Sequence, residues 1–266
     1  FFFCFMVNIG KRDALYHLVL MHEGLSNEEI RSPIVNSWRR GFQSVCNMLF
    51  EGKNITKMEF LESLNENFRQ SVYAIYREDF HTIRVNDVNF PKCLRQSSCS
   101  AIYTKGDNEL LRAPTISVNG SYNAEEKLEP SKWEEYQKEV IGSVIGLVKK
   151  GFTIVSEVYG DTHRIALNTA LKYGGSAIGI VKGGLDAHVE ETLKPRLLKK
   201  GLLVSDMPVG MRYLWDFSAF NSRRLSSNIE MYLSNFGTQR FSIHDDGEFY
   251  SNFYSRNPES EEFEEF

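Results

Sequence analysis

Two segments of the chain nearly repeat one another, and they restrict the fold more than any other feature. Residues 147–157 read LVKKGFTIVSE, and residues 197–207 read LLKKGLLVSDM. In each, a helix would end at two lysines, which suit the negative pole of a helix, followed by a glycine. An apolar run then follows, as in a short strand that is buried on both faces. The repeat predicts helix-to-strand units of a parallel sheet with right-handed crossovers.

Further units of the same kind surround this repeat. Strands are expected at 115–118, 152–156, 176–181 and 202–205, and helices at 131–150, 163–173 and 190–200. Ser131 and Glu134 fit the capping box that opens the first of these helices. The sequence therefore predicts an α/β fold, a Rossmann-like, doubly wound, mainly parallel sheet preceded by a small helical domain.

The sequence predicts four parts. Residues 1–80 are expected to form a small helical domain of four short helices, with capping boxes at Ser26-x-x-Glu29 and Thr56-x-x-Glu59. Residues 81–114 are expected to form an irregular connector, and 115–235 the Rossmann-like domain. Residues 236–266 are expected to form a disordered tail, because residues 245–266 carry eight acidic residues against one arginine.

Composition restricts the compartment and the partners only loosely. The net charge is −4, but the acidic residues concentrate after Asp245, so the rest of the chain does not exclude a polyanion as partner. The four cysteines form no CxxC pair, which indicates a reducing, cytoplasmic setting. The apolar start, FFFCFMV, is too short to cross a bilayer and lacks the features of a signal peptide. Met6 is the expected natural start.

The sequence contains none of the common catalytic signatures. Walker A, GxGxxG, HExxH and GxSxG motifs are absent, and the six histidines are scattered without metal-ligand spacing. Glu157 and Asp161 follow a predicted strand and would suit acid–base chemistry, although a solvated loop is the simpler interpretation. We therefore expect a protein that is not an enzyme, without metal or cofactor.

Polar and glycine-rich turns at the carboxyl ends of the predicted strands form the candidate site. The strand at 176–181 stops at Gly183-Gly184, which are expected to lead into a helix whose backbone amides, with Lys182, would hold an anion. The other turn residues are Gly120, Ser121, Ser156 and Ser205. Arg223 and Arg224, after Asn221, would either pair with phosphates or form an exposed helix start. The cluster Trp38-Arg39-Arg40 would either touch nucleic acid or form a solvated helix face.

The order and spacing of several segments resemble the DNA-processing protein A (DprA/Smf) family. Phe90-Pro91-x-x-Leu94 and Ile102-Tyr103-x-Lys105-Gly106 are similar to the "YP..L…LY.KG" entry of that family, and Ile116–Ser121 resembles its "aiVGsR" strand and turn. The later matches are Gly151–Ser156 with Ala170-Leu171, Gly174-Gly175, Ile178–Val181, Gly184-Leu185-Asp186, Gly201–Gly210, Trp215-x-Phe217 and Asn221. The resemblance covers about residues 85–228.

The chain departs from the family pattern at the residues that would line the ligand pocket. Tyr122 stands where an arginine normally ends the first turn, and the "SGlArGiD..AH" signature is replaced, with Glu157, His163 and Leu167 at its marked positions. In "FP.RNR" the arginines fall on Phe220 and Ser222, beside Arg223 and Arg224. The family's later strands are not recognisable after Asn228. The chain resembles a divergent member, or one truncated or frameshifted near its C-terminus.

The resemblance implies a protein that binds single-stranded DNA and loads the RecA recombinase onto it during DNA uptake in natural transformation. It implies a Rossmann-like fold, a possible homodimer, no membrane and no turnover of a substrate. The implied DNA- or phosphate-binding residues are Gly120, Ser121, Tyr122, Ser156, Lys182, Gly183, Gly184, Asn221, Arg223 and Arg224. Tyr122 would replace the missing arginine by stacking on a base. Two alternatives stay open, a phosphoribohydrolase-like nucleotide enzyme, whose PGGxGTxxE turn is absent, and a decayed member without a working pocket.

Overall fold

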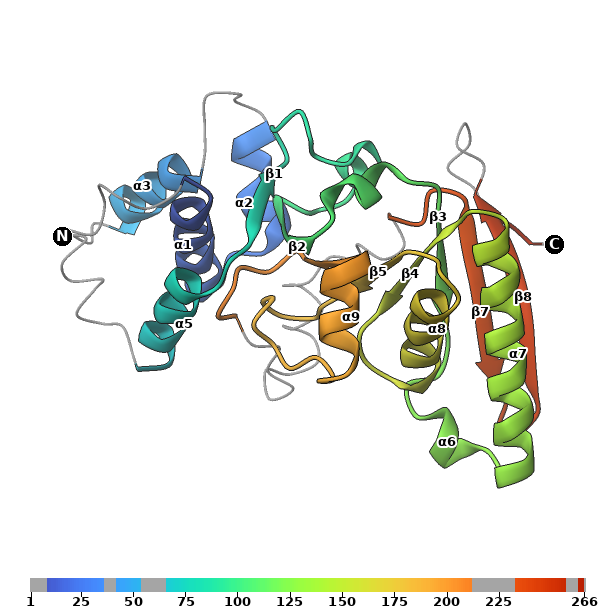
Figure 1. Cartoon of the computed structure of the whole chain (residues 1–266). Coiled ribbons are helices and arrows are strands. Elements are labelled where there is room, and N and C mark those ends of the chain that lie inside the picture. The colour runs from blue at the N-terminus through green and yellow to red at the C-terminus, as the bar shows by residue number, and fades with distance from the viewer. Residues whose placement is uncertain (1–8, 36–41, 54–65, 212–232, 257–262, 266) are drawn as a thin grey trace. The chain divides into compact units, whose positions relative to one another are not determined.

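The computed structural model describes residues 9–35, 42–53, 66–211, 233–256 and 263–265 (Figure 1). The chain divides into two compact units, each built from segments that are distant in sequence. Unit 1 comprises residues 1–104, 182–187 and 205–227, and unit 2 comprises 105–181, 188–204 and 228–266. The predictions for Thr56-x-x-Glu59 and for Trp38-Arg39-Arg40 lie outside the described residues.

Unit 1 contains the predicted helical segment. Its described helices are α1 (Ile9–His22), α2 (Asn27–Val35), α3 (Phe42–Lys53) and α5 (Glu66–Arg77). The capping box before α2 is confirmed, because the Glu29 carboxylate accepts hydrogen bonds from both the amide and the hydroxyl of Ser26. The Glu29 amide in turn donates to the Ser26 hydroxyl.

The stretch 81–114 is more regular than the predicted connector. It contains strand β1 (His81–Arg84) and strand β2 (Ala101–Gly106), which pair antiparallel, and short 3₁₀ helices at Lys92–Gln96 and Asn108–Arg112. Within unit 1, β2 is buried and packs against α1, where His17 Nδ1 lies 2.7 Å from the Tyr103 hydroxyl. Burial raises the pKa of Tyr103 well above its usual value, so this hydroxyl stays protonated. The periodicity of 81–84 was too short to reveal the pairing.

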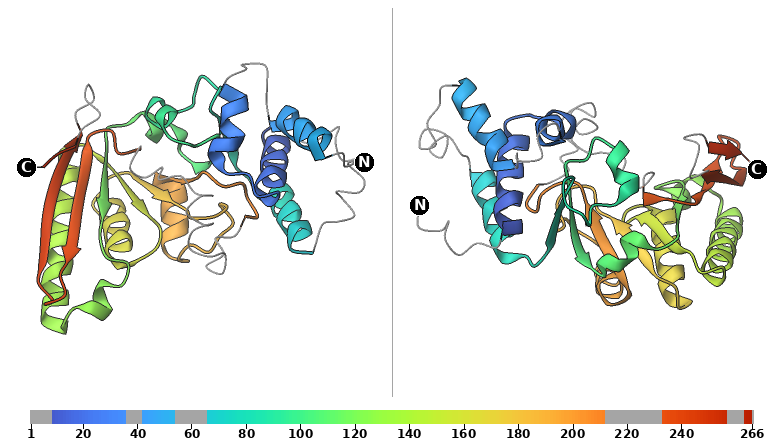
Figure 2. Two further views of the ribbon diagram at one scale, coloured as in Figure 1. Left: turned by 180° about the vertical axis from the view of Figure 1, so that it is seen from behind. Right: turned by 90° about the horizontal axis from the view of Figure 1, so that it is seen from above.

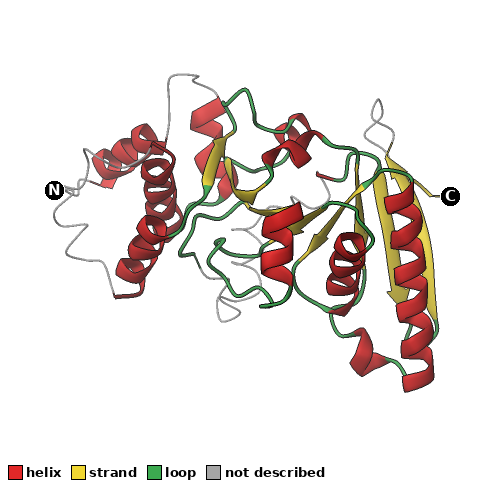
Figure 3. Cartoon of the chain, in the orientation of Figure 1, coloured by secondary structure: helices red, strands yellow, loops and turns green. Residues whose placement is uncertain are grey.

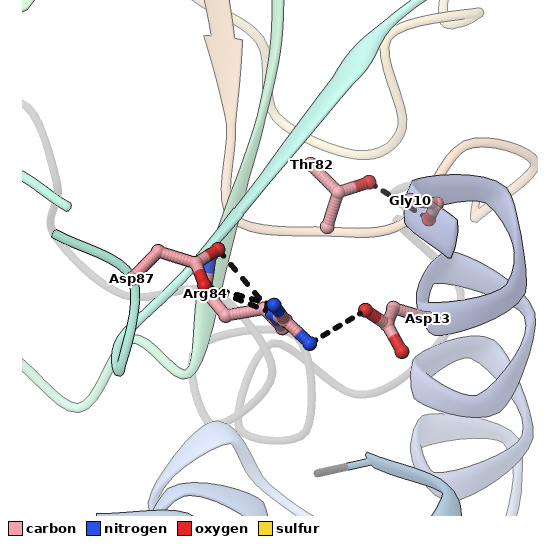
Figure 4. Close-up of polar contacts among 5 residues, drawn as sticks. All are labelled: Gly10, Asp13, Thr82, Arg84 and Asp87. Atoms are coloured by element: carbon pink, nitrogen blue, oxygen red, sulfur yellow. Dashed lines mark hydrogen bonds and ion pairs between the residues drawn. The ribbon is translucent and has the colours of Figure 1, made fainter. Parts of the chain in front are cut away.

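An ion-pair cluster fastens α1 to β1 within unit 1 (Figure 4). The Arg84 guanidinium lies 3.2 Å from a carboxylate oxygen of Asp13 and 2.9 Å from one of Asp87. The Thr82 hydroxyl donates to the Gly10 carbonyl oxygen at 2.9 Å. Burial raises the pKa of Asp13, while Arg84 opposes that rise by favouring the charged carboxylate.

Replacing Arg84 by alanine should lower the free energy of unfolding by about 1–3 kcal/mol at neutral pH, because Asp13 would stay buried without its cation. The loss should shrink as the pH falls through the raised pKa of Asp13, since a protonated carboxyl needs no counter-charge. Urea denaturation at neutral and at acidic pH measures both effects. Arg112→Ala, which removes an exposed pair with Glu109, is the control and should change stability by under about 0.5 kcal/mol. An equal loss in both variants would contradict the prediction.

Unit 2 contains the predicted parallel sheet (Figure 3). Strands β3 (Thr115–Asn119), β4 (Thr153–Glu157), β5 (Ala177–Ile180) and β6 (Gly201–Ser205) are parallel neighbours in the order β6-β5-β4-β3. Nearly every residue of these strands is buried, as expected for a sheet that is covered on both faces. The Rossmann-like α/β fold is confirmed.

The helices of unit 2 follow the predicted alternation. They are α6 (Ala124–Lys127), α7 (Pro130–Lys149), α8 (Asp161–Lys172) and α9 (Leu193–Lys200). Of these, α7, α8 and α9 lie against the same face of the sheet (Figures 1 and 2). None of the helices in the described ranges is both long enough and apolar enough to cross a membrane.

The two near-repeats reach their strands in different ways. After α7, Gly151 adopts a φ of +88°, so the chain turns before β4 begins at Thr153. After α9, β6 begins at once at Gly201, which has an extended φ of −152°. A Cβ on Gly201 would lie 2.4 Å from the Ala177 carbonyl oxygen, so this position needs glycine for space rather than for its φ.

The predicted disordered tail is wrong over most of its described length. Strands β7 (Gly237–Ile243) and β8 (Phe249–Arg256) form a hairpin, and β7 pairs parallel with β3. A third strand, β9 (Phe263–Glu265), pairs antiparallel with β8. The hairpin forms because Asp246-Gly247 supplies its turn, with a φ of +77° at Gly247, and because Phe241 and Phe249 pack edge-on against Tyr136 of α7.

Candidate functional site

The turn after β3 is fastened to the start of α8 through backbone groups. The Ser121 carbonyl oxygen accepts from the Thr162 hydroxyl at 2.9 Å and from the Thr162 amide at 3.4 Å. The Tyr122 carbonyl oxygen accepts from the Asp161 amide at 3.0 Å. These amides are the ones that a helix N-terminus would offer to a phosphate. Because the chain's own carbonyl groups occupy them, this helix start is not the anion cradle that the turn pattern suggested.

Gly120 and Gly160 allow the turn and the helix to approach so closely. A Cβ on Gly120 would lie 2.6 Å from Cγ2 of Thr162 and 2.9 Å from the Tyr136 hydroxyl. Gly160 has φ +82° and ψ 158°, a conformation that essentially only glycine adopts. A Cβ there would lie 2.7 Å from both Cα and Cδ1 of Tyr122. Both glycines therefore serve the packing of the turn.

Tyr122 lies over this junction with its ring partly open to solvent. Its hydroxyl donates a hydrogen bond to the Glu157 carboxylate at the end of β4. Its ring centroid lies 5.0 Å from that of His163, with 34° between the two ring planes. Tyr122 is 46% exposed, whereas His163 is 2% exposed and Glu157 is 9% exposed. The arrangement fixes one aromatic ring at the carboxyl edge of the sheet.

Ser156 is fully buried beneath this ring and supports His163. Its hydroxyl donates to the Val118 carbonyl oxygen at 2.6 Å and lies 2.9 Å from Nδ1 of His163. A serine hydroxyl has a single proton, so once that proton is given to Val118, His163 must donate through Nδ1. A serine nucleophile requires the opposite arrangement, in which the histidine accepts the serine proton. Ser156 is thus arranged to hold His163 and not to attack a substrate.

The charges around the turn are mainly negative. Asp161 accepts from the Glu125 amide at 3.0 Å and pairs with Arg164 at 2.9 Å. Arg164 also lies 3.8 Å from a carboxylate oxygen of Glu190. Together with Glu157, these acids make the turn a poor place for a bare phosphate and a better one for an uncharged aromatic group.

The second predicted group, Lys182-Gly183-Gly184, lies in unit 1. The Gly183 carbonyl oxygen accepts from the Ser205 hydroxyl at 2.5 Å, and the Gly184 amide donates to the Met211 carbonyl oxygen at 2.6 Å. Asp186 accepts from the Gly210 amide at 2.6 Å. Lys182 is half-buried, and both glycines are buried.

The helix expected at 190–200 is present with a later start, and no helix begins at the Gly183-Gly184 turn itself. The next helix, α9, begins only at Leu193, and the intervening turn is closed by the segment 205–211 instead. Without a helix start, the turn offers no row of free amides to an anion. Lys182 remains its only cationic side chain among residues 182–187.

The predicted site residues thus fall into three sets. Unit 2 brings together Gly120, Ser121, Tyr122 and Ser156, and unit 1 holds Lys182, Gly183 and Gly184. Asn221, Arg223 and Arg224 lie outside the described residues.

The partners of Tyr122 were not predicted. The sequence singles out Glu157 and His163 as separate departures from the family pattern, and no sequence signal points to Thr162 or Tyr136. The available signal was topological, because residues after adjacent parallel strands meet at one edge of the sheet. Tyr122, Glu157 and His163 all depart from the family pattern, and the structure brings the three side chains into contact.

Comparisons with known proteins agree with this architecture. The sequence model of the family described as DNA recombination-mediator protein A matches residues 81–223. No curated protein matches the chain. Among solved structures, DNA processing protein A (DprA) from Streptococcus pneumoniae is similar, with a TM-score of 0.50 and 19% identity over 85% of this chain and 74% of that one.

A second solved structure is DNA processing protein A from Helicobacter pylori, reported for its single-stranded DNA binding mode. Its TM-score is 0.48, with 18% identity over 64% of this chain and 73% of that chain. At such identities, a likeness between structures concerns the fold alone. The family match covers more than half of the sequence and includes β1 to β6. The chain belongs to the DNA recombination-mediator protein A family.

Proposed function

We propose that this protein binds single-stranded DNA and acts as a recombination mediator that delivers the strand to a RecA-type recombinase during DNA uptake. Membership of the DNA recombination-mediator protein A family supports this role. The observation that carries the DNA-binding part is the half-exposed Tyr122 ring, held at the carboxyl edge of the sheet by Glu157 and His163. The proposal includes a homodimer and a cytoplasmic location, and no substrate turnover.

A fixed aromatic ring favours single strands over duplexes. Every base has an aromatic face, so stacking on a tyrosine tolerates any sequence. In a duplex those faces are already stacked inside the helix, and opening it costs free energy. Because His163 lies beneath Tyr122 and Glu157 holds its hydroxyl, the ring loses little further freedom when a base binds.

The proposal separates base contacts from phosphate contacts. The Glu157 carboxylate contacts Tyr122, and Asp161 lies in the same junction through its backbone amide, so we assign the base to Tyr122 and the phosphates to cations elsewhere. Lys182, in the Gly183-Gly184 turn, and the pair Arg223-Arg224 are the proposed phosphate contacts.

A salt titration of binding to labelled single- and double-stranded oligonucleotides tests the proposal. We expect a preference for the single strand, with affinity falling by about 0.7 decades per decade of salt for each phosphate neutralised. Lys182→Gln should reduce that slope by roughly one phosphate's share. Equal affinity for single strand and duplex would refute the proposal. Hydrolysis of a nucleoside monophosphate by the purified protein would favour the nucleotide-enzyme alternative instead.

A further inference from the structure

The face of the β7–β8 hairpin that points away from α7 has an unusual set of side chains. Side chains of directly opposed residues share a face, and the register pairs Thr238 with Tyr254, Arg240 with Asn252, and Ser242 with Tyr250. The opposite face is the one that packs on α7, because Ser251 donates to Glu139 of that helix. In the view from behind, α7 lies beyond the red strands (Figure 2, left).

This face carries two tyrosines, Tyr250 and Tyr254, and the cross-strand pair that contains Arg240 lies between theirs. Tyr250 is 53% exposed and packs edge-on against His244, with ring centroids 4.8 Å apart. Arg240 is exposed, and Tyr254 is partly exposed. Residues four apart along a strand are separated by about 14 Å, so the two rings would take two different bases of one strand.

The chemistry of the face fits a nucleic acid better than a protein. All six side chains carry a hydrogen-bonding group and none is aliphatic, so the face lacks the apolar core that a protein interface usually has. Exposed aromatic side chains on a sheet, accompanied by arginine and amide side chains, are the arrangement on which single-stranded nucleic acids stack. The outer edge of β8, from Tyr254 to Arg256, is paired with β9, so a strand of a partner protein could not pair there.

The face continues into the turn that carries Tyr122. In the parallel register of β3 and β7, Ser117 lies opposite Thr238 and Asn119 lies opposite Arg240. The Ser117 hydroxyl donates to that of Thr238 at 2.7 Å, which confirms that the two side chains share this face. Asn119 directly precedes Gly120-Ser121-Tyr122. A strand leaving Tyr122 would therefore meet Arg240 next.

Carboxylates at the turn between β7 and β8 limit the path that a DNA strand could take over the hairpin. The hairpin turn carries Asp245, Asp246 and Glu248, and Lys132 of α7 pairs with Glu248. These charges repel phosphates at the tip of the hairpin. The favourable path therefore runs across the sheet, from the β3 turn to the rows of Arg240 and Tyr254, with Tyr250 at its limit.

We propose that the exposed face of β7–β8, formed by Arg240, Tyr250 and Tyr254 and flanked by Asn252 and Asn119, binds single-stranded DNA as a continuation of the strand held at Tyr122. This inference rests on the proposed function and extends it. It makes binding depend on the length of the DNA. A short oligonucleotide occupies the Tyr122 turn alone, while a longer one also covers the hairpin.

The experiment compares two labelled oligo-dT probes, about 5 and about 15 nucleotides long, with the full chain. Tyr250→Ala and Tyr254→Ala should each weaken binding of the longer probe by about 5- to 150-fold and leave the short probe unchanged. Arg240→Gln should reduce the salt dependence for the longer probe by about one phosphate's share. Tyr250→Phe, which keeps the ring, should bind like the original protein.

Tyr173→Ala is the matched control, because Tyr173 is 51% exposed and lies at the end of α8. Thermal unfolding of every variant separates lost binding from lost structure. If Tyr250→Ala affects the long probe no more than Tyr173→Ala does, the inference is wrong, although binding of the short probe would keep the proposed function. If neither probe binds the original protein, the proposed function and the inference both fall.

Discussion

Replacing Gly160 by alanine should lower the free energy of unfolding by about 2–4 kcal/mol, the largest effect on stability that we expect. Gly160 adopts φ +82° and ψ 158°, which an alanine can reach only at a cost. The new Cβ would also lie 2.7 Å from Cα of Tyr122, a backbone atom that cannot rotate away. Urea denaturation of the full chain measures the loss.

Gly142→Ala is the matched control for this substitution. Gly142 lies inside α7, where an added Cβ has no neighbour within 4 Å. Alanine is the better helix former, so this variant should gain about 0.5–1 kcal/mol. A loss of less than about 0.5 kcal/mol in Gly160→Ala would show that the turn before α8 relaxes freely, and it would remove the basis for a rigid Tyr122.

Replacing Tyr122 by alanine should weaken binding of single-stranded DNA by about 5- to 150-fold, which corresponds to about 1–3 kcal/mol for one stacked base. The fold should persist, because the turn is held by the carbonyl oxygens of Ser121 and Tyr122 and these are unchanged. Fluorescence anisotropy with a short oligo-dT probe gives the affinity, and circular dichroism checks the fold.

Two conservative variants distinguish stacking from hydrogen bonding at this position. Tyr122→Phe keeps the ring and loses only the bond to Glu157, so its affinity should stay within about threefold of the original. Glu157→Gln keeps an acceptor for the tyrosine and removes a carboxylate near the DNA, so it should bind more tightly, most clearly at low salt. An unchanged affinity in Tyr122→Ala would contradict the base-stacking role.

The parallel sheet could be predicted because its local signals agree with its tertiary structure. Residues 152–155 (FTIV) and 201–204 (GLLV) are short runs without polar alternation, and they prove to lie in buried strands with parallel neighbours. The lysine–lysine–glycine endings placed the helices before them to within a few residues. The secondary structure of each of these elements is determined mainly by its own residues, so it can be predicted from the local sequence alone.

The hairpin was missed because its stability depends on a distant helix. β8 (FYSNFYSR) mixes pairs of aromatic residues with small polar residues beside a run of acids, which by composition alone favours disorder. The hairpin packs onto the distant helix α7, where Tyr136 contacts Phe241 of β7 and Phe249 of β8. Asp246-Gly247 between two alternating segments was the available signal for a hairpin.

The candidate site was predictable in position and only partly in chemistry. Parallel strands bring their carboxyl ends to one edge, so the turn at Gly120-Ser121-Tyr122 was located from the strand order. Which amides remain open depends on atoms 40 residues away, such as the Thr162 groups that bond to Ser121. The spacing of residues in the sequence does not tell whether such amides bond to carbonyl oxygens of the chain or stay open for a phosphate.

The interleaving of the two units has a consequence for how the protein is made. Unit 1 needs residues 182–187 and 205–227 in addition to the first 104, and unit 2 resumes at 228. Thr115 on β3 bonds to Asn235, which is 120 residues later in the chain. During synthesis, one edge of β3 therefore stays unpaired until the segment around Asn235, 120 residues later, has left the ribosome. Pairing between strands so distant in sequence slows folding, so we expect the pairing of β3 with β7 to form late.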